Sequence, residues 1–354
     1  MDSVESRTAD AVNRFAVRPM FDLEKDNVLE FIKNGNYHRV LLQLPEGLKS
    51  QGFKLAEEIE DALDVEVVLS ANACYGACQL AVEEQTTLRA DAIVHYGHSP
   101  LVQKSIPNVL YVEARATENV EEAVRKALKI LEQEKKIGLA TVVQHLDQLE
   151  HVSEVVRESG KEPYLGKACG QVVYDGQVLG CDYSTSLRIA GIVEAYIFIG
   201  GGDFHAIGIQ LATGRRTIVA DPYANQARDM TETVRLLLRK RWAAITKFQD
   251  SSRIGVVIGV REGQFDIESA LRVKRLLEEN GKRCVLLSVS ECTPENLESF
   301  TDLEAFVITA CPRIAIDDQE RFRRPILNIE EAHIAAGKRR WEDYGKSAPQ
   351  QETA

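Results

Sequence analysis

Short apolar runs alternate with helical patterns along most of the chain. The apolar runs cover 39–44, 65–70, 92–96 and 109–114, then 137–143, 162–166, 195–201 and 216–221, then 253–260, 283–290, 304–310 and 325–331. Helical patterns lie between them at 48–63, 79–90, 118–134, 145–159, 224–248 and 266–280. Continuous apolar strands between amphipathic helices are typical of parallel sheets that helices cover on both faces. The sequence therefore predicts an α/β protein.

The same order of elements recurs at intervals of roughly one hundred residues, as an internal repeat does. A chain of 354 residues is also too long for one ordinary domain core. We therefore predict three homologous α/β domains with parallel sheets, at 1–116, 117–223 and 224–340. The polar residues 341–354 are expected to form a flexible tail.

Charge and hydropathy exclude several classes of partner. Lys and Arg number 43 against 54 Asp and Glu, a formal net charge of −11, which argues against non-specific binding to nucleic acid or to a membrane surface. No apolar run approaches the ~20 residues that span a bilayer, and the first residues lack the apolar core of a signal peptide. We expect a soluble, cytoplasmic protein.

Seven cysteines are spread through the chain, at positions 74, 78, 169, 181, 284, 292 and 311. In the cytoplasm thiols stay reduced, so a disulfide framework is not expected. The chain has no CxxC and no CxxxCxxC spacing. A metal site must therefore be assembled from distant parts of the chain.

Ligands of open α/β sheets bind beyond the carboxyl ends of the strands. The segments predicted at that edge are "YGACQ" 75–79, "HYGHSPL" 95–101, "GQVLGCDYS" 176–184, "GGGDFHAIG" 200–208 and "ACPRIAID" 310–317. Each predicted domain thus places one cysteine there: Cys78 or Cys74, then Cys181, then Cys311. Packing about a pseudo-threefold axis would let three thiolates converge. Cys169, Cys284 and Cys292 are interpreted as buried filler.

Three thiolates suit two kinds of centre. One is zinc completed by a histidine or water. The other is an iron–sulfur cluster whose missing fourth ligand leaves one iron open. The residues alone leave both open. The glycine loop that carries Gly201, Asp203 and His205 can cradle an anion with its backbone N–H groups, or can be only a tight turn.

Four motifs together carry a family resemblance. "ACYGACQLA", "HYGHSPL", "GQVLGCDYST" and "ITACPRIAIDD" resemble, in this order, the radical enzymes of archaeal diphthamide biosynthesis, the 2-(3-amino-3-carboxypropyl)histidine synthases. The resemblance covers about residues 25–335. It implies three flavodoxin-like domains around a central [4Fe-4S] cluster, with one cysteine ligand per domain.

The resemblance also implies a reaction and partners. Such enzymes transfer a 3-amino-3-carboxypropyl group from S-adenosylmethionine to a histidine of translation elongation factor 2 and release methylthioadenosine. The archaeal form is a homodimer, and an electron donor of unidentified nature reduces the cluster. The chemistry belongs to the cofactors, so no residue is named as a general base.

Carried over by motif, the cluster ligands are Cys78, Cys181 and Cys311. Cys78 lies about one repeat before Cys181, which favours it over Cys74. The chain departs from the eukaryotic pattern, in which a cysteine and an acid stand where this chain has Gln79 and Leu80. We expect the helix after Cys78 to favour its thiolate electrostatically.

Two loops are candidates for contact with the cofactor or the substrate. His95, Gly97, His98 and Ser99 are expected to hold part of S-adenosylmethionine. Gly201, Asp203 and His205 are expected to contact cofactor or substrate. Arg313 either pairs with a carboxylate or caps a strand edge, and "GKRR" 337–340 is interpreted as a solvated face.

Three other functions stay in competition. Quinolinate synthase also resembles three such domains around a three-cysteine cluster, but it is a dehydratase. A non-catalytic electron-relay subunit is the second alternative. The third is a structural zinc protein.

Overall fold

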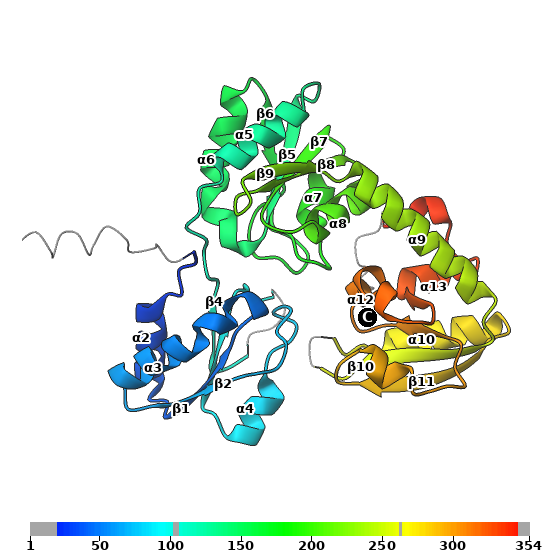
Figure 1. The fold of residues 1–354 in the computed structure, drawn as a ribbon, viewed down its shortest axis with the longest axis horizontal. Helices are drawn as coiled ribbons and strands as arrows, with labels where there is room; N and C mark the ends of the chain where they lie inside the picture. Colours follow the sequence, from blue (N-terminus) through cyan, green and yellow to red (C-terminus); the bar gives the residue numbers. More distant parts are fainter. Residues whose placement is uncertain (1–19, 102–105, 262–263, 346–354) are drawn as a thin grey trace, which may run out of the picture.

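The computed structural model describes residues 20–101, 106–261 and 264–345. Within them the strands form three sheets, ordered β2-β1-β3-β4, β6-β5-β7-β8-β9 and β11-β10-β12-β13. The sheets occupy three lobes, coloured blue to cyan, green, and yellow to orange in Figure 1. The order second-first-third-fourth recurs in each sheet and is the beginning of the flavodoxin-like order. We call the three lobes units one, two and three.

Unit one contains α2 (Lys25–Gly35), β1 (Arg39–Gln43), a 3₁₀ helix (Glu46–Gln51), α3 (Gly52–Ala62), β2 (Glu66–Leu69), α4 (Val82–Leu88), β3 (Ala92–Tyr96) and β4 (Val109–Val112). Its strands are all parallel. Residues of α2 and α3 pack on one face, and Ala81, Val82 and Ala90 around α4 pack on the other.

Unit two contains α5 (Glu121–Ile130), β5 (Lys136–Thr141), a 3₁₀ helix (Val143–Gln148), α6 (Leu149–Glu158), β6 (Glu162–Leu165), α7 (Ser184–Ile189), β7 (Ala195–Ile199), α8 (Phe204–Thr213), β8 (Arg216–Asp221) and β9 (Gln226–Asp229). Helices α5 and α6 cover one face of the sheet, and α7 and α8 cover the other. Only the edge strand β9 is antiparallel among the described strands.

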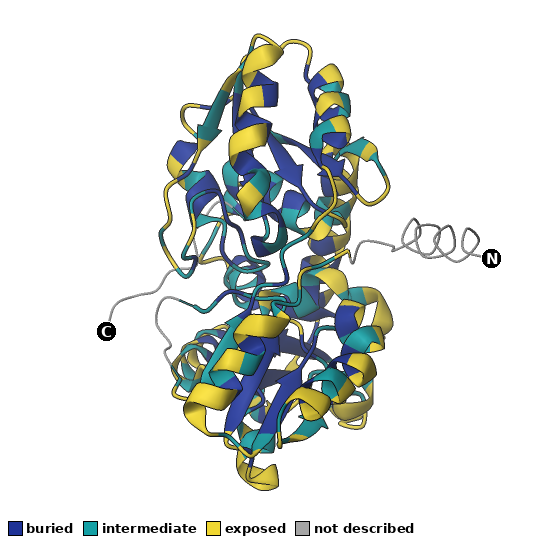
Figure 2. Ribbon diagram, turned by 90° about the vertical axis from the view of Figure 1, so that its left-hand side faces the viewer, coloured by how far each residue is buried: buried dark blue, intermediate teal, exposed yellow. Residues whose placement is uncertain are grey.

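Unit three contains α9 (Thr231–Gln249), β10 (Arg253–Gly259), α10 (Ile267–Glu279), β11 (Arg283–Val289), α11 (Pro294–Leu297), β12 (Ala305–Ile308), α12 (Pro312–Asp317), a 3₁₀ helix (Gln319–Arg321), β13 (Ile326–Asn328), α13 (Ile329–Ala335) and a last 3₁₀ helix (Trp341–Asp343). Figure 2 shows the resulting pattern, in which buried strands lie between helices that expose only their outer faces. Double-sided burial explains why the strands are continuous apolar runs.

A carboxylate at the start of the third strand ties each unit together in the same way. Asp91, Glu194 and Glu304 each precede that strand and accept hydrogen bonds from the backbone N–H groups of two residues that lead into the first strand. The donor pairs are 38–39, 135–136 and 252–253. These hydrogen bonds lower the pKa of all three carboxyl groups. The shared device supports the repeat that the hydrophobic pattern indicated.

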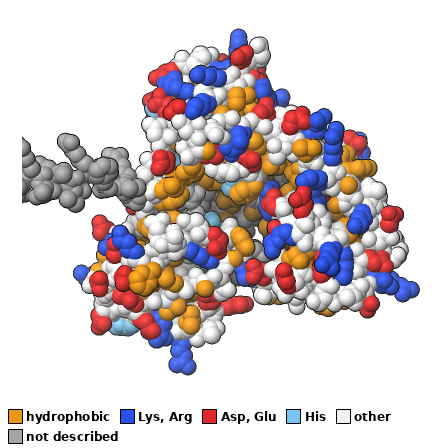
Figure 3. All heavy atoms as spheres, in the orientation of Figure 1, with side chains coloured by type: hydrophobic (Ala, Val, Ile, Leu, Met, Phe, Trp, Pro, Cys, Tyr) orange, Lys and Arg blue, Asp and Glu red, His pale blue; other side chains and the backbone are white. Residues whose placement is uncertain are grey.

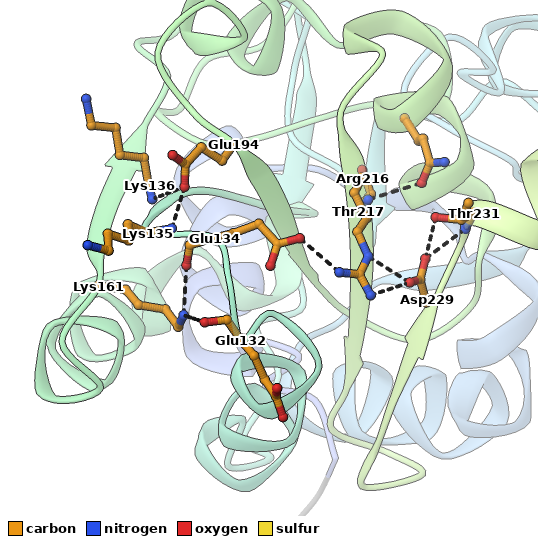
Figure 4. A network of polar contacts seen from close by, with 11 residues as sticks. Glu132, Glu134, Lys135, Lys136, Lys161, Glu194, Arg216, Thr217, Asp229 and Thr231 are labelled. Carbon is orange, nitrogen blue, oxygen red and sulfur yellow. Dashed lines mark hydrogen bonds and ion pairs between the residues drawn. The ribbon is translucent and has the colours of Figure 1, made fainter.

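Further polar contacts lie at the edge of the second sheet where its parallel strands begin (Figure 4). Arg216 pairs with Glu134 and with Asp229, at 2.9 and 2.8 Å. Lys161 donates to the backbone oxygen of Glu134 at 2.7 Å. These charged side chains are therefore paired within the fold. They lie at the edge of the sheet opposite to the loops that follow the strands.

The helix predicted at 224–248 is wrong in its first part. The side chain of Asp221 accepts from the backbone of Tyr223 and Ala224, both at 3.0 Å, and Asn225 is left-handed with φ 49°. This turn reverses the chain, so β9 pairs with β8 and α9 begins only at Thr231. The second sheet thus extends beyond the domain boundary predicted at residue 223.

Two further predictions near the C-terminal side need correction. The strand predicted at 325–331 ends at Asn328, because Asn328 and Glu331 form a capping box that starts α13. The flexible tail predicted at 341–354 does not begin at 341. Tyr344 is buried, and its hydroxyl donates to Glu331 at 2.9 Å. Residues 346–354 lie outside the described part.

Glu331 also belongs to a buried ion pair. Arg241 of α9 donates to both of its carboxylate oxygens at 2.6 Å, and to the backbone oxygens of Ala315 and Ile326. The pair satisfies its hydrogen-bonding groups inside the third unit, as a buried charge requires. It joins α9, α12 and α13. In the described ranges no helix is long and apolar enough to cross a membrane.

A buried histidine makes the stability of the fold sensitive to acid. Burial lowers the pKa of His145 to about 4, and Asp221 opposes this shift; the Nε2 atom lies 3.0 Å from the Tyr223 hydroxyl. The unfolded chain binds the proton near pH 6.5, so stability is lost as pH falls from about 6.5 toward 4.

We expect His145→Gln to reduce the loss of unfolding free energy between pH 7 and pH 5 by on the order of 2 kcal/mol. Denaturant melts at the two pH values measure it. The exposed His38→Gln variant is the control and should leave the loss unchanged. An equal acid sensitivity in wild type and His145→Gln would contradict the assignment.

Candidate functional site

Hydrogen bonds join the loops of the first two units at the carboxyl ends of their strands. Gln177 donates to the Ser99 hydroxyl at 2.7 Å, and Gln144 donates to the backbone oxygen of Gly97, also at 2.7 Å. Gln177 is buried, and its side-chain oxygen accepts from the backbone of Val173 at 3.2 Å. The "HYGHS" and "GQVLGC" motifs therefore lie side by side.

An aromatic contact joins the second and third units. The guanidinium of Arg313 lies over the Phe204 ring, 5.0 Å from its centroid. Gly180 lies against both, because a Cβ added there would come within 3.0 Å of the Phe204 ring and 3.8 Å of Arg313. A larger residue at 180 would thus press on Phe204. The space-filling view is hollowed between the three lobes, and histidine side chains are visible there (Figure 3).

Cys78, Cys181 and Cys311 influence one another electrostatically. Burial raises the pKa of Cys181 to about 12, and Cys78 and Cys311 raise it further. Burial also raises the pKa of Cys311, with Cys78 adding to the shift. All three are partly buried, and none of them forms a disulfide within the described residues. The fold thus brings together one cysteine from each unit, separated widely in the sequence.

Cys74 has different surroundings from Cys78. It is buried, with 3% of its surface exposed. Burial raises its pKa to about 12, Cys78 adds to the shift, and a hydrogen bond from the Gly76 backbone opposes it, with smaller effects of Lys49 and Glu46. Neither Cys181 nor Cys311 is among its main influences. Cys78 thus interacts electrostatically with the cysteines of the other two units, whereas the main influences on the pKa of Cys74 come from its own unit.

Helix position favours a thiolate at Cys311 and not at Cys78. Cys311 is the N-cap residue of α12, and the backbone N–H groups of Arg313 and Ile314 counteract the effect of burial on its pKa. The helix after Cys78 was predicted to begin at 79, but α4 starts at Val82. Cys78 lies instead in a turn that the Gln79 N–H closes on the Gly76 oxygen at 3.0 Å.

The predicted histidines all have pKa values well below the usual range. His98 and His205 interact electrostatically. Burial lowers the pKa of His205 to about 3, with Arg313 and His98 adding to the shift. Burial lowers the pKa of His98 to about 4. His95 is fully buried at the end of β3, and its pKa is also well below the usual range. All three rings are therefore neutral at pH 7.

Asp203 and Gly201 have structural partners. Asp203 accepts from Arg228 at 2.7 Å, and Arg228 also pairs with Asp221. A Cβ at Gly201 would meet the Tyr223 ring at 2.9 Å. The glycine loop leads into α8. The carboxylate of Asp203 is thus engaged beside the loop.

Several residues of the site carried no signal of their own in the sequence. Phe204, Tyr183 and Asp317 surround Arg313. Asp317 accepts both hydrogen bonds of the Arg313 guanidinium, at 2.8 and 2.6 Å, so the pairing alternative for Arg313 is correct. Tyr183 donates to the Gly180 oxygen at 2.9 Å. Tyr183 and Asp317 do fall within the quoted motifs, which is the signal that could have found them.

The remaining cysteines differ from one another. Cys169, Cys284 and Cys292 are partly buried. Burial raises the pKa of Cys284 to about 11. Burial, Asp318 and Cys311 raise the pKa of Cys292 to about 12. Cys292, interpreted as filler, therefore lies near the third cysteine of the centre.

The donor set fits an iron–sulfur cluster. Three partly buried thiols from three units meet with neutral histidines nearby, and soft thiolate ligands select such clusters or zinc. Bringing three thiols together in a desolvated place is unfavourable for their ionisation, and a bound cationic centre would reverse that cost.

Known proteins share this architecture. Residues 44–345 match the family described as "Putative diphthamide synthesis protein". The chain is 34% identical over 92% of its length to the 2-(3-amino-3-carboxypropyl)histidine synthase of Pyrococcus horikoshii, 93% of which is covered. It is 28% identical over 91% of its length to subunit 1 of that synthase from Schizosaccharomyces pombe, with 75% of the relative covered.

Solved structures agree with the sequence comparison. The crystal structure of Dph2 from Pyrococcus horikoshii with a 4Fe-4S cluster has a TM-score of 0.82 and 32% identity, and the match covers 91% of this chain and 93% of that one. A second crystal structure of the same protein has a TM-score of 0.83. This chain therefore belongs to the diphthamide synthesis family of transferases.

Proposed function

We propose that this chain catalyses the first step of diphthamide biosynthesis. The reaction transfers a 3-amino-3-carboxypropyl group from S-adenosylmethionine to a histidine of translation elongation factor 2, with methylthioadenosine as the second product. The observation that carries the proposal is the meeting of Cys78, Cys181 and Cys311, one from each unit. The family membership supports it.

Cys78, Cys181 and Cys311 would hold a [4Fe-4S] cluster, and the three units would be related by a pseudo-threefold axis. When bound and reduced, such a cluster with one open iron supplies a single electron to the sulfonium of S-adenosylmethionine. The protein's own contribution is to bind the reactants, orient them and exclude water. The electron donor is a separate partner, and we propose a cytoplasmic homodimer as the working form.

S-adenosylmethionine would lie between the "HYGHS" loop and the glycine loop. Neutral His205 would border this space, and a neutral imidazole can both donate and accept hydrogen bonds. Arg313 is held by Asp317 and Phe204, so its charge is fixed beside the cysteines. His95 is fully engaged in the interior, so Gly97 and Ser99 are the members of its loop that we assign to cofactor contact.

The first prediction concerns the cluster ligands. After anaerobic reconstitution we expect about four irons per chain, as for a cubane cluster. Cys78→Ala, Cys181→Ala and Cys311→Ala should each lose most of this iron, because each removes a ligand. Cys74→Ala and the matched control Cys284→Ala should retain it. Iron and sulfide analysis measures the loading, and circular dichroism checks the fold. Full loading without Cys181 or Cys311 would refute the ligand assignment.

The second prediction concerns the products. The reduced chain, given S-adenosylmethionine and elongation factor 2, should release methylthioadenosine and add one 3-amino-3-carboxypropyl group to the factor. Chromatography and mass spectrometry of the modified histidine measure both. Cys181→Ala should abolish both signals. Formation of quinolinate, or a reconstituted chain inert toward S-adenosylmethionine, would support a rival function; a colourless, zinc-loaded chain would support the structural zinc protein.

The third prediction concerns the contact between units one and two. Gln177→Leu removes the hydrogen bond to Ser99 and leaves buried backbone groups unpaired, which should cost about 1–3 kcal/mol of stability. We also expect faster loss of iron to a chelator, since the loop after β3 and the segment that carries Cys181 lose a hydrogen bond that joins units one and two. The exposed Gln226→Leu is the control. Iron release at the wild-type rate would show that the contact is structural only.

A further inference from the structure

We propose that Cys74, His95 and His98 form a separate mononuclear zinc site beside the three-cysteine centre. Their potential ligand atoms, one sulfur and two ring nitrogens, all lie within 4.8 Å of one another. None of the three belongs to the proposed set of cluster ligands. The inference is independent of the cluster and goes beyond the proposed transferase activity.

The contacts of Gln43 determine which ring nitrogen of His95 carries no proton and can therefore bind a metal. The Gln43 side-chain nitrogen donates to the Gln79 oxygen at 2.6 Å, and its oxygen accepts from the Ala81 N–H at 3.1 Å. The amide orientation is therefore fixed, and its oxygen faces His95 Nδ1 at 2.9 Å. Nδ1 must carry the proton in that hydrogen bond. The lone pair of His95 is consequently on Nε2, which points to His98.

This arrangement is the one that orients metal-binding histidines. Such a histidine usually donates its other ring N–H to a carbonyl or carboxylate, which fixes the tautomer. Gln43 provides that acceptor for His95. His95 has no exposed surface, so the ring cannot turn to offer its lone pair elsewhere. The ring of His95 is thus already oriented for a metal before the metal binds.

The distance between the two ring nitrogens suits zinc with little movement. His95 Nε2 and His98 Nδ1 are 3.0 Å apart. Two nitrogens at about 2.0–2.1 Å from a tetrahedral zinc are separated by roughly 3.3 Å, so opening the pair by a few tenths of an ångström admits the ion. His98 would shift its proton to the other nitrogen, and the Cys74 thiol would release its proton to solvent. One thiolate and two imidazoles are zinc ligands, and water completes the tetrahedron.

A metal here would act on the turn that carries Cys78. Cys74 precedes Cys78 by one short turn, while His95 and His98 lie at the end of β3 and in the loop that follows it. The ion would therefore tie the loop after β2 to the loop after β3, and Cys78 would be held by a fixed anchor. Without a metal, the same residues form only a histidine pair beside a buried thiol.

The test uses the full-length chain in two arms. In the first, Cys78→Ala, Cys181→Ala and Cys311→Ala are combined so that no cluster forms, and Co²⁺ is titrated as a spectroscopic substitute for Zn²⁺. We expect one Co²⁺ per chain, with sulfur-to-cobalt charge transfer in the near ultraviolet and displacement by Zn²⁺. Adding Cys74→Ser should abolish the charge-transfer band, and Cys284→Ser should leave it unchanged. Gln43→Leu should weaken Zn²⁺ binding about 10–100-fold.

The second arm does not depend on that triple variant. The wild-type holoprotein should contain one zinc per chain besides its iron, and Cys74→Ser should lose the zinc while retaining the iron. This outcome is distinguishable from failure of the proposed function, which would appear in the iron. Absence of zinc from the holoprotein, no binding of Co²⁺, or a charge-transfer band that persists in Cys74→Ser would overturn the proposal.

Discussion

The parallel direction of the strands is the constraint on which the rest of the structure depends. In each unit the four principal strands run the same way, so all their carboxyl ends lie at one edge of the sheet. The loops that carry Cys78, Cys181 and Cys311 leave from those edges. At the opposite edge, Asp91, Glu194 and Glu304 hold the starts of the strands in register, which leaves the carboxyl edges free for chemistry.

The thiolate forms of the three cysteines at this centre are energetically unfavourable unless a ligand binds them. Burial makes the thiolates of Cys181 and Cys311 costly, and the cysteines oppose one another's ionisation. Against this, the first turn of α12 offers N–H groups to Cys311. Direct contacts between the units, Gln177 with Ser99 and Arg313 with Phe204, hold the loops in place. A cationic centre bound by the thiols would convert their mutual repulsion into attraction.

Two cysteines four residues apart lie in different surroundings. Cys78 interacts with Cys181 and Cys311, whereas Cys74 lies by His95 and His98. The histidines also have different neighbours. His205 lies near Arg313 and His98, while a hydrogen bond to Gln43 holds the buried ring of His95. If zinc binds to Cys74, His95 and His98, it would stabilise the turn from which Cys78 reaches the other units.

The sequence by itself determined the α/β class, the threefold recurrence of elements and the motifs of the site, because buried parallel strands are continuous apolar runs and the motifs are local. It also favoured Cys78 over Cys74 as the cluster ligand of the first unit, through the YGAC motif and the repeat spacing, and this assignment stays a prediction. The hairpin of β9 and the capping box at Asn328 were missed, since side-chain hydrogen bonds overrode the hydrophobic pattern there. Only the tertiary structure decided that Asp203 pairs with Arg228 and that Cys74 faces two histidines. Such neighbours come from separate segments, and their distances depend on how the segments pack.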